Sequence, residues 1–195
     1  SDIQRLNTRY LNSPYSFVLD EKLVFESMYK QYINVPKNLS LIEAGKFLCL
    51  EEVEKIDSPM KILKYLDRHS ACVIKPIRNG GGYGIFVLKK IEGNYFLNEK
   101  QIDEAGLEKA TSKLNNYIVN EFVEQSNFSK DFYPKTTNTI RILTMIDPLT
   151  NKPFIPIAVQ RMGNLTSIPA DNWTQGGLSA EIDLETGELG KGVSY

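Results

Sequence analysis

The sequence predicts an α+β fold with antiparallel sheets. Helix-like and strand-like segments alternate over the first two thirds, and the last third carries strand signals separated by turn sequences. A glycine cluster, Gly80-Gly-Gly-Tyr-Gly84, joins two β-type runs and does not open a helix. These observations together argue against a doubly wound α/β sheet.

Capping residues and apolar runs predict the elements of the N-terminal part. Asp20 is suited to be the N-cap of a helix, and Ser58 followed by Pro59 marks the start of another. Ala44-Gly45 separates two short strands. The expected elements are a helix over 20–32, a hairpin of 39–43 with 46–50, and a helix over 58–68.

Strand-like runs dominate the rest of the chain and surround one helix, expected from about 103 to 114. Asp147 and Glu185 begin turn sequences between antiparallel strands. The expected strands are 72–75, 85–88, 94–97, 117–123, 139–146, 154–161, 177–184 and 189–193.

The composition is ordinary for a globular chain. Of 195 residues, 42% are hydrophobic and 24% charged, and the formal net charge is −1. One domain, or one with an appended lobe, is expected, and neither a nucleic-acid footprint nor binding to an anionic membrane surface. No apolar run has the length of a membrane span and no signal peptide opens the chain, so we expect a cytoplasmic protein. Cys49 and Cys72 are expected to be buried free thiols.

Lys75 and the glycine cluster predict a phosphate site. A strand-borne lysine supplies positive charge for phosphate oxygens, and glycine lets backbone N–H groups approach a ligand closely. The glycines concerned are Gly80, Gly81, Gly82 and Gly84. A tight hairpin bend beside an exposed lysine is the alternative that this run leaves open.

Three common phosphate loops do not match this stretch. The P-loop string G-x-x-x-x-G-K-[ST] is absent, and a dinucleotide-binding turn opens a helix, whereas Ile85–Leu88 reads as a strand. A protein kinase has its lysine after the glycine loop, and here Lys75 precedes it.

Arg141 and Arg161 lie inside β-type runs, where an arginine is costly unless it faces a ligand or a carboxylate. Both are therefore candidates for anion binding, with a paired structural arginine as the alternative. His69, the single histidine, has no partner for nucleophilic catalysis and is expected to be a solvated loop residue.

Seven strings, in order from about residue 20 to the end, resemble the ATP-grasp superfamily, most closely its domains associated with sugar transfer and the cell envelope. They are Val73-Ile-Lys-Pro76, Gly80-Gly-Gly-Tyr-Gly84, Tyr117-Ile-Val-Asn-Glu-Phe-Val123, Asn138-Thr-Ile-Arg-Ile-Leu-Thr144, Arg161-Met-Gly163, Asp171-Asn172 and Gly176-Gly177.

The resemblance implies two lobes of antiparallel sheet with helices that hold ATP and Mg²⁺ between them. Lys75 and Lys22 would reach the phosphates, with a solvated lysine at a helix start as the alternative for Lys22. The glycine loop would close over the phosphates as a flap. Arg141 and Arg161 would hold the transferred phosphoryl group and a carboxylate substrate. Asn172 and the glycine pair after it would bring backbone close to the reacting centre, with a plain turn as the alternative.

The resemblance also implies an adenine site beside the end of the strand over 117–123. Glu121, Phe122 and Val123 would lie beside the base, although a sheet-core role explains the last two equally well. Glu124 or Asp131 would bind the ribose hydroxyls.

The family's metal carboxylates, an Asp on a late strand and a Glu-x-Asn on the next, have no match here. Asp183 is a conceivable substitute, and we leave the metal ligands unassigned. The more economical expectation is a chain that stops before the metal strands. It would comprise an N-terminal part at 1–57, a small lobe at 58–120 and the start of a large lobe at 121–195.

The resemblance implies an ATP-binding domain of a carboxylate–amine, or thiol, ligase that acts through an acyl phosphate in cell-envelope polysaccharide modification. Its partners would be a small-molecule carboxylate and an amine, without nucleic acid or membrane insertion, and its oligomeric state stays open. A nucleotide-binding module without catalysis and a kinase-like phosphotransferase acting on a hydroxyl are the alternatives.

Overall fold

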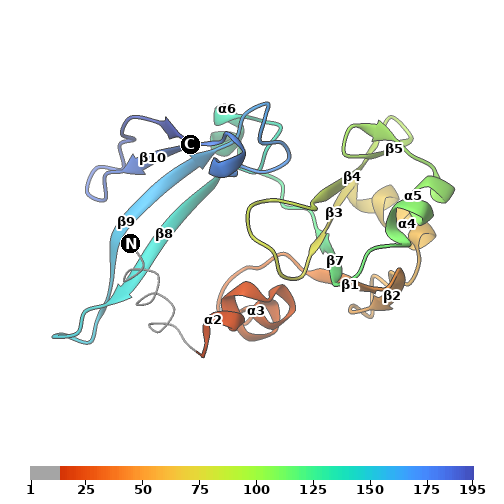
Figure 1. Ribbon diagram of the computed structural model, residues 1–195, viewed down its shortest axis with the longest axis horizontal. Helices are drawn as coiled ribbons and strands as arrows, with labels where there is room; N and C mark the ends of the chain where they lie inside the picture. The colour runs from red at the N-terminus through yellow and green to blue at the C-terminus, as the bar shows by residue number, and fades with distance from the viewer. Residues whose placement is uncertain (1–13) are drawn as a thin grey trace. The chain divides into compact units, whose positions relative to one another are not determined.

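The computed structural model describes residues 14–195, which form two compact units divided between Phe122 and Val123 (Figure 1). The first unit contains a seven-stranded sheet and the second a four-stranded sheet. All neighbouring strands in the described sheets run antiparallel. The predicted α+β class is therefore confirmed.

The first sheet has the strand order β2-β1-β7-β3-β4-β5-β6, so β7, the last of these strands in the sequence, lies between β1 and β3. The strands are β1 Asn38–Glu43, β2 Lys46–Cys49, β3 Ala71–Pro76, β4 Phe86–Ile91, β5 Asn94–Leu97, β6 Lys100–Gln101 and β7 Tyr117–Glu121. The predicted hairpin at Ala44-Gly45 is present, with both turn residues at positive φ. The sequence analysis missed β6 and gave β7 two residues too many.

Four described helices accompany this sheet, namely α2 Ser16–Asp20, α3 Lys22–Tyr29, α4 Pro59–His69 and α5 Glu104–Thr111. The single helix predicted over 20–32 is wrong in its bounds. Glu21 has extended backbone and caps α3, because its carboxylate accepts hydrogen bonds from the N–H groups of Leu23 and Val24. This side chain satisfies N–H groups that the first turn of a helix otherwise leaves unpaired.

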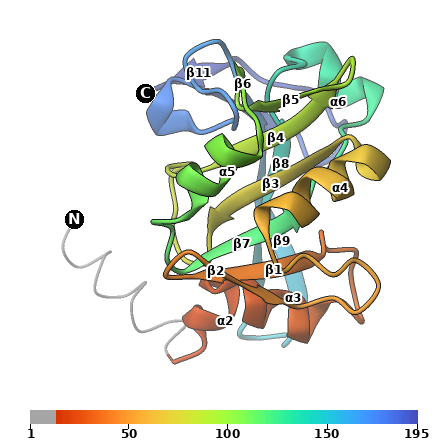
Figure 2. The same cartoon turned by 90° about the vertical axis from the view of Figure 1, so that its right-hand side faces the viewer.

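α4 and α5 cover one face of the first sheet, which we call the helix face (Figure 2). The apolar stripe of α4 packs there against alternate residues of β3 and β4, and each fully buried aliphatic side chain contributes about 1.5–3 kcal/mol. The core residues include Ile62, Leu66, Cys72, Ile74, Leu88, Leu107 and Val119.

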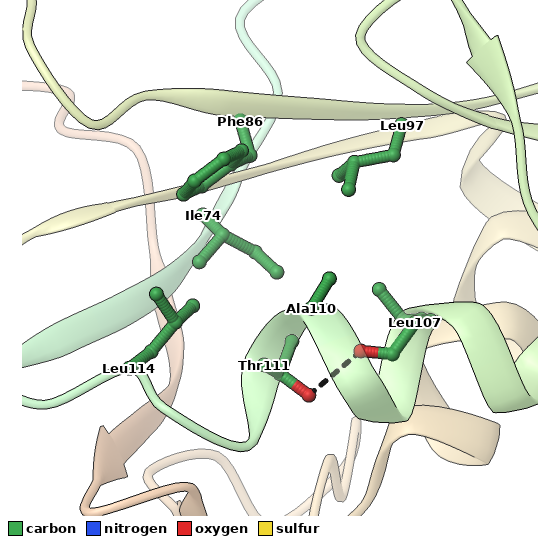
Figure 3. A pocket seen from close by; sticks show the side chains of 7 residues that line it. All are labelled: Ile74, Phe86, Leu97, Leu107, Ala110, Thr111 and Leu114. Atoms are coloured by element: carbon green, nitrogen blue, oxygen red, sulfur yellow. Dashed lines mark hydrogen bonds between the residues drawn. The ribbon is translucent and has the colours of Figure 1, made fainter.

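A small apolar cavity lies on the helix face, and Figure 3 shows Ile74 and Phe86 of the sheet pointing toward α5 across it. Its only polar side chain, Thr111, bonds to the carbonyl of Leu107 on its own helix. Successive residues of a strand point to opposite faces, so Lys75 lies on the other face, which we call the lysine face. The cavity therefore belongs to the core and not to the predicted phosphate site.

The second unit is built on a sheet of order β11-β10-β9-β8. Its elements are α6 Asn127–Phe132, β8 Thr139–Ile146, β9 Pro153–Met162, the 3₁₀ turn Trp173–Gln175, β10 Leu178–Ile182 and β11 Val193–Ser194. The predicted β8–β9 hairpin is confirmed. The strand expected over 189–193 is wrong in its bounds, because only an isolated bridge at Leu189 precedes the two-residue β11.

The two cysteines differ in their surroundings. Cys72 is a buried free thiol, as expected, and burial raises its pKa to about 12. Cys49 is exposed on the edge strand β2, so its predicted burial is wrong. Within residues 14–195, no helix is long and apolar enough to cross a membrane.

Candidate functional site

Lys75 and Lys22, both predicted phosphate ligands, come together in the first unit. The Lys75 ammonium donates to Oδ1 of Asn120 at 2.8 Å. Lys22 begins α3, and its ammonium donates to the carbonyl of Ile77 at 3.0 Å. The two ammonium groups are close enough for the charge of Lys22 to lower the pKa of Lys75. A helix start and a strand end thus bring two cations to one place.

Neither lysine has a carboxylate in an ion pair within the described part of the chain. Burial is the main cause that lowers the pKa of Lys75, to about 8, and the charge of Lys22 adds to it. Burial also lowers the pKa of Lys22, against an opposing effect of Glu21 and Asp20. Two partly desolvated cations without a partner anion favour the binding of a polyanion.

The glycine loop leaves β3 shortly after Lys75 and returns as β4. Gly81, Gly82 and Gly84 have φ values of 80°, 73° and 71°, which a residue with a side chain rarely adopts. At Gly84 a Cβ would also lie 2.6 Å from the hydroxyl of Tyr117, whereas at Gly80 nothing lies within 4 Å. The backbone conformation therefore accounts for three glycines, and Gly80 borders open space.

Glu121 has partners other than a base. Its N–H donates to the carbonyl of Lys37 at 2.9 Å, and its carboxylate accepts from the N–H of Lys37 at 3.2 Å. Register places Glu121 opposite Cys72, hence on the helix face. Phe122 follows at the end of the unit, where the ammonium of Lys89 lies 5.5 Å from its ring centroid. The N–H of Glu121 is thus already occupied by a backbone carbonyl.

The predicted ribose acids belong to the second unit. Glu124 is exposed and forms an ion pair of 3.1 Å with Lys130, whereas Asp131 is exposed on α6. Val123, the first residue of this unit, is 47% exposed and is therefore not a core residue of the described fold. The choice between the two acids stays open.

Arg161 is anchored in the second unit. Its guanidinium donates to the carbonyl of Asp171 at 2.8 Å and lies 3.5 Å from the carboxylate of that residue, which also accepts from the hydroxyl of Thr139. Both charged side chains are nearly buried. Nε of Arg161 is buried without a hydrogen-bond partner among the described residues. This is the geometry of a paired arginine with one donor left over.

Arg141 differs from Arg161 although both lie on the same face of the β8–β9 pair. Register sets Thr139 opposite Arg161 and Arg141 opposite Val159, so the two arginines are diagonal neighbours. Arg141 is exposed and has no ion-pair partner in residues 14–195. Of the two arginines, Arg141 is the one whose guanidinium is accessible to an anion.

Asn172 and the two glycines after it form a tight turn. The N–H of Gly177 donates to the carbonyl of Asn172 at 3.0 Å, and Gly176 has a φ of 95°. A Cβ on Gly177 would lie 2.7 Å from the carbonyl oxygen of Asp171. The positive φ accounts for Gly176, and close packing against the backbone accounts for Gly177.

The described residues contain no cluster of metal-binding side chains. Among residues 14–195, no group of three or more His, Cys, Asp or Glu side chains could hold a metal ion. Asp183 caps its own turn, where the N–H groups of Glu185 and Thr186 donate to its carboxylate and lower its pKa. Asp171 is occupied by Arg161 and Thr139.

The sequence analysis missed two residues, Asn120 and Asn38, which are buried beside the lysines. A signal was present, because Asn120 is the single amide inside the apolar strand run over 117–123, and a buried amide needs hydrogen-bond partners. His69 ends α4, where it stacks on Tyr65 and contacts Glu54, and is not a loop residue.

A family model described as sugar-transfer associated ATP-grasp matches residues 3–194. Searches of curated proteins and of solved structures gave no significant match.

Proposed function

The chain belongs to the sugar-transfer associated ATP-grasp family, and we propose that its first unit binds the phosphates of ATP through Lys22 and Lys75. The observation that carries this proposal is the pair of neighbouring ammonium groups that lack a carboxylate partner. Each contact of an ammonium with a phosphate oxygen is charge-assisted and contributes about 1.5–3 kcal/mol. The glycine loop beside Lys75 would add backbone N–H donors.

We further propose that the nucleotide serves a ligase reaction. A carboxylate oxygen attacks the γ-phosphorus of ATP and ADP leaves, which gives an acyl phosphate. An amine or thiol then attacks the acyl carbon, and the phosphate departs with the bonding electrons while the nucleophile loses its proton. Arg141, exposed and without an ion-pair partner in the described residues, would hold the carboxylate or the transferred phosphoryl group.

The contribution of these residues would be positioning and charge stabilisation, because no covalent intermediate with the protein is required. Mg²⁺ in the reactions of this family neutralises charge on the β- and γ-phosphates. Residues 14–195 contain no cluster of three or more metal-binding side chains, and the roles proposed here for the lysines and for Arg141 do not depend on the metal.

Titration calorimetry with ATP, ADP and inorganic tripolyphosphate tests the binding proposal. We expect all three to bind and adenosine to bind much more weakly, because the lysines recognise phosphate. Failure of both ATP and tripolyphosphate to bind would refute it. Release of ADP on addition of a carboxylate and an amine tests the ligase step separately.

A nucleotide-binding module without catalysis is the second candidate. The observations that favour it are that Asp171 and Asp183 bond to partners inside the second unit, and that residues 14–195 contain no cluster of three or more metal-binding side chains. ATP binding without ADP release, with carboxylates and amines of several classes, would support this candidate over the ligase.

A further inference from the structure

We infer that the carboxamides of Asn120 and Asn38 form a neutral scaffold that positions Lys75 and Lys22 for a polyphosphate ligand. Asn120 is the positioning residue, since it is the one that bonds to a lysine ammonium. The inference deepens the proposed function and rests on it for the identity of the ligand.

The orientation of the Asn120 amide is fixed by its surroundings. Its Nδ2 donates to the carbonyls of Pro36 and Lys37 at 3.1 and 2.8 Å and to Oδ1 of Asn38 at 2.9 Å. Three acceptors around one NH₂ group exclude the flipped amide, because that rotamer would set an oxygen against three oxygens. Oδ1 of Asn120 must therefore face Lys75.

Asn38 carries the connection to the second lysine. Its Oδ1 accepts from Asn120, and its Nδ2 donates to the backbone carbonyl of Lys22 at 3.2 Å. The ammonium and the N–H of Lys22 both donate to the carbonyl of Ile77, two residues after Lys75. The bonds thus form a closed circuit from Lys75 through both amides and Lys22 back to the end of β3.

The neutrality of this scaffold matters for function. A carboxylate in place of the Asn120 amide would pair with Lys75 and compete with an anionic ligand, as Asp171 pairs with Arg161 in the second unit. The acids near Lys22 form hydrogen bonds with backbone N–H groups. Glu21, the N-cap of α3, accepts from the N–H of Val24, and Glu26 inside α3 accepts from the N–H of Asn38. Burial of Asn38 and Asn120, 4% and 3% exposed, keeps water from replacing the bonds.

A double-mutant cycle on the 195-residue chain tests whether Asn120 acts through Lys75. The variants are Asn120→Ala, Lys75→Ala and the double substitution, and the probe is inorganic tripolyphosphate at one fixed salt concentration. We expect Asn120→Ala to weaken binding about tenfold, the scale of one charge-assisted contact, and less than about twofold when Lys75 is already alanine. Equal losses in both backgrounds would overturn the inference, because general structural damage does not depend on Lys75.

A second measurement needs no ligand. We expect ¹³C relaxation of the Lys75 Cε to report an ordered side chain in the wild type and a mobile one in Asn120→Ala. Unchanged order in that variant would also overturn the inference. Should Asn120→Ala fail to fold, Asn120→Ser, which keeps a donor on a shorter side chain, takes its place in both measurements.

Asn94→Ala is the matched control, because Asn94 is an exposed amide of the same sheet that bonds to Gln101 and lies beyond the other end of β3. We expect it to change neither tripolyphosphate binding nor the order of Lys75. If the wild type binds no tripolyphosphate, the proposed function fails, and the relaxation measurement still decides whether Asn120 positions Lys75.

Discussion

Lys75 and Asn120 are diagonal neighbours on β3 and β7, and a hydrogen bond of 2.8 Å joins their side chains across the two strands. Lys75 is thereby held by a neutral acceptor, so its positive charge is oriented but not cancelled. Lys22 adds a second cation nearby. A lysine held by a neutral acceptor keeps a charge that a ligand could meet, and the proposed phosphate role of Lys75 can therefore be tested directly.

Lys75→Ala should weaken ATP binding by about 1.5–3 kcal/mol, because the substitution removes one charge-assisted phosphate contact. The free energy of unfolding should change little, because removal of a buried charge offsets the hydrogen-bond donor that the buried Oδ1 of Asn120 loses. Titration calorimetry measures the affinity, and Lys61→Ala on the exposed side of α4 is the control. Equal ATP affinities of Lys75→Ala and the wild type would show that Lys75 does not bind phosphate.

Tripolyphosphate binding should weaken as pH rises above about 8. In the free protein the pKa of Lys75 is lowered to about 8 from 10.5, so the lysine is cationic below this pH and loses its charge above it. A bound polyanion favours the cation and raises this pKa again, so binding near pH 9 must take up a proton. At about pH 7 the lysine is already protonated and this uptake is small.

Calorimetry in buffers of different ionisation enthalpy measures the proton uptake. We expect most of it to disappear in Lys75→Ala, and any remainder to come from Lys22, whose pKa burial also lowers. Proton uptake near pH 9 that is the same in both proteins would assign the titration to another group.

The glycine loop should become protected from hydrogen exchange when a nucleotide binds. Residues 78–83 are exposed or half-buried and include Gly80, Gly81 and Gly82, which have no side chain to pack, so little opposes local opening in the free protein. Exchange measured by mass spectrometry, with and without an ATP analogue, gives the change in protection. The β1–β2 turn serves as an internal control, and an unchanged loop would indicate an ordinary hairpin bend.

The sequence predicted elements whose signals are local and missed those decided by tertiary contacts. Alternation and turn residues were enough for the β8–β9 hairpin, and Ser58-Pro59 for the start of α4. The break at Glu21 was not predictable in this way, because an acid can cap a helix or lie inside one, and the residue after Glu21 bonds to the carbonyl of Ile77, which is distant in the sequence.

In the candidate site, too, local sequence signals were predictive and contacts between distant residues were not. The spacing of Lys75 to the glycine loop is visible in the sequence. Its contact with Asn120 is not, because it joins residues 45 positions apart. Likewise, no periodicity distinguishes Arg141, which is exposed, from Arg161, which is paired with Asp171. Pairing of this kind depends on the loop between β9 and β10, whose path the sequence pattern does not specify.

The two arginines should respond differently to removal. Arg161→Ala leaves the nearly buried carboxylate of Asp171 without its cation, and breaking a buried pair from one side costs about 3–5 kcal/mol. Arg141→Ala removes an exposed side chain and should change stability by less than about 0.5 kcal/mol. Urea unfolding followed by tryptophan fluorescence, which reports on Trp173 in the same unit, measures both. Equal stabilities of the two variants would contradict the structural pairing of Arg161.

Mg²⁺ should have little effect on nucleotide binding by the 195-residue chain, because Asp171 and Asp183 already have partners and residues 14–195 contain no cluster of three or more metal-binding side chains. The decisive variant is Asp183→Asn, which retains the side-chain oxygen that caps the turn but loses the charge that a metal needs. We expect ATP affinity with and without Mg²⁺ to differ by less than about threefold in the wild type, and by the same factor in Asp183→Asn. A strong Mg²⁺ dependence that Asp183→Asn abolishes would make Asp183 a metal ligand and would show that its turn rearranges when nucleotide binds.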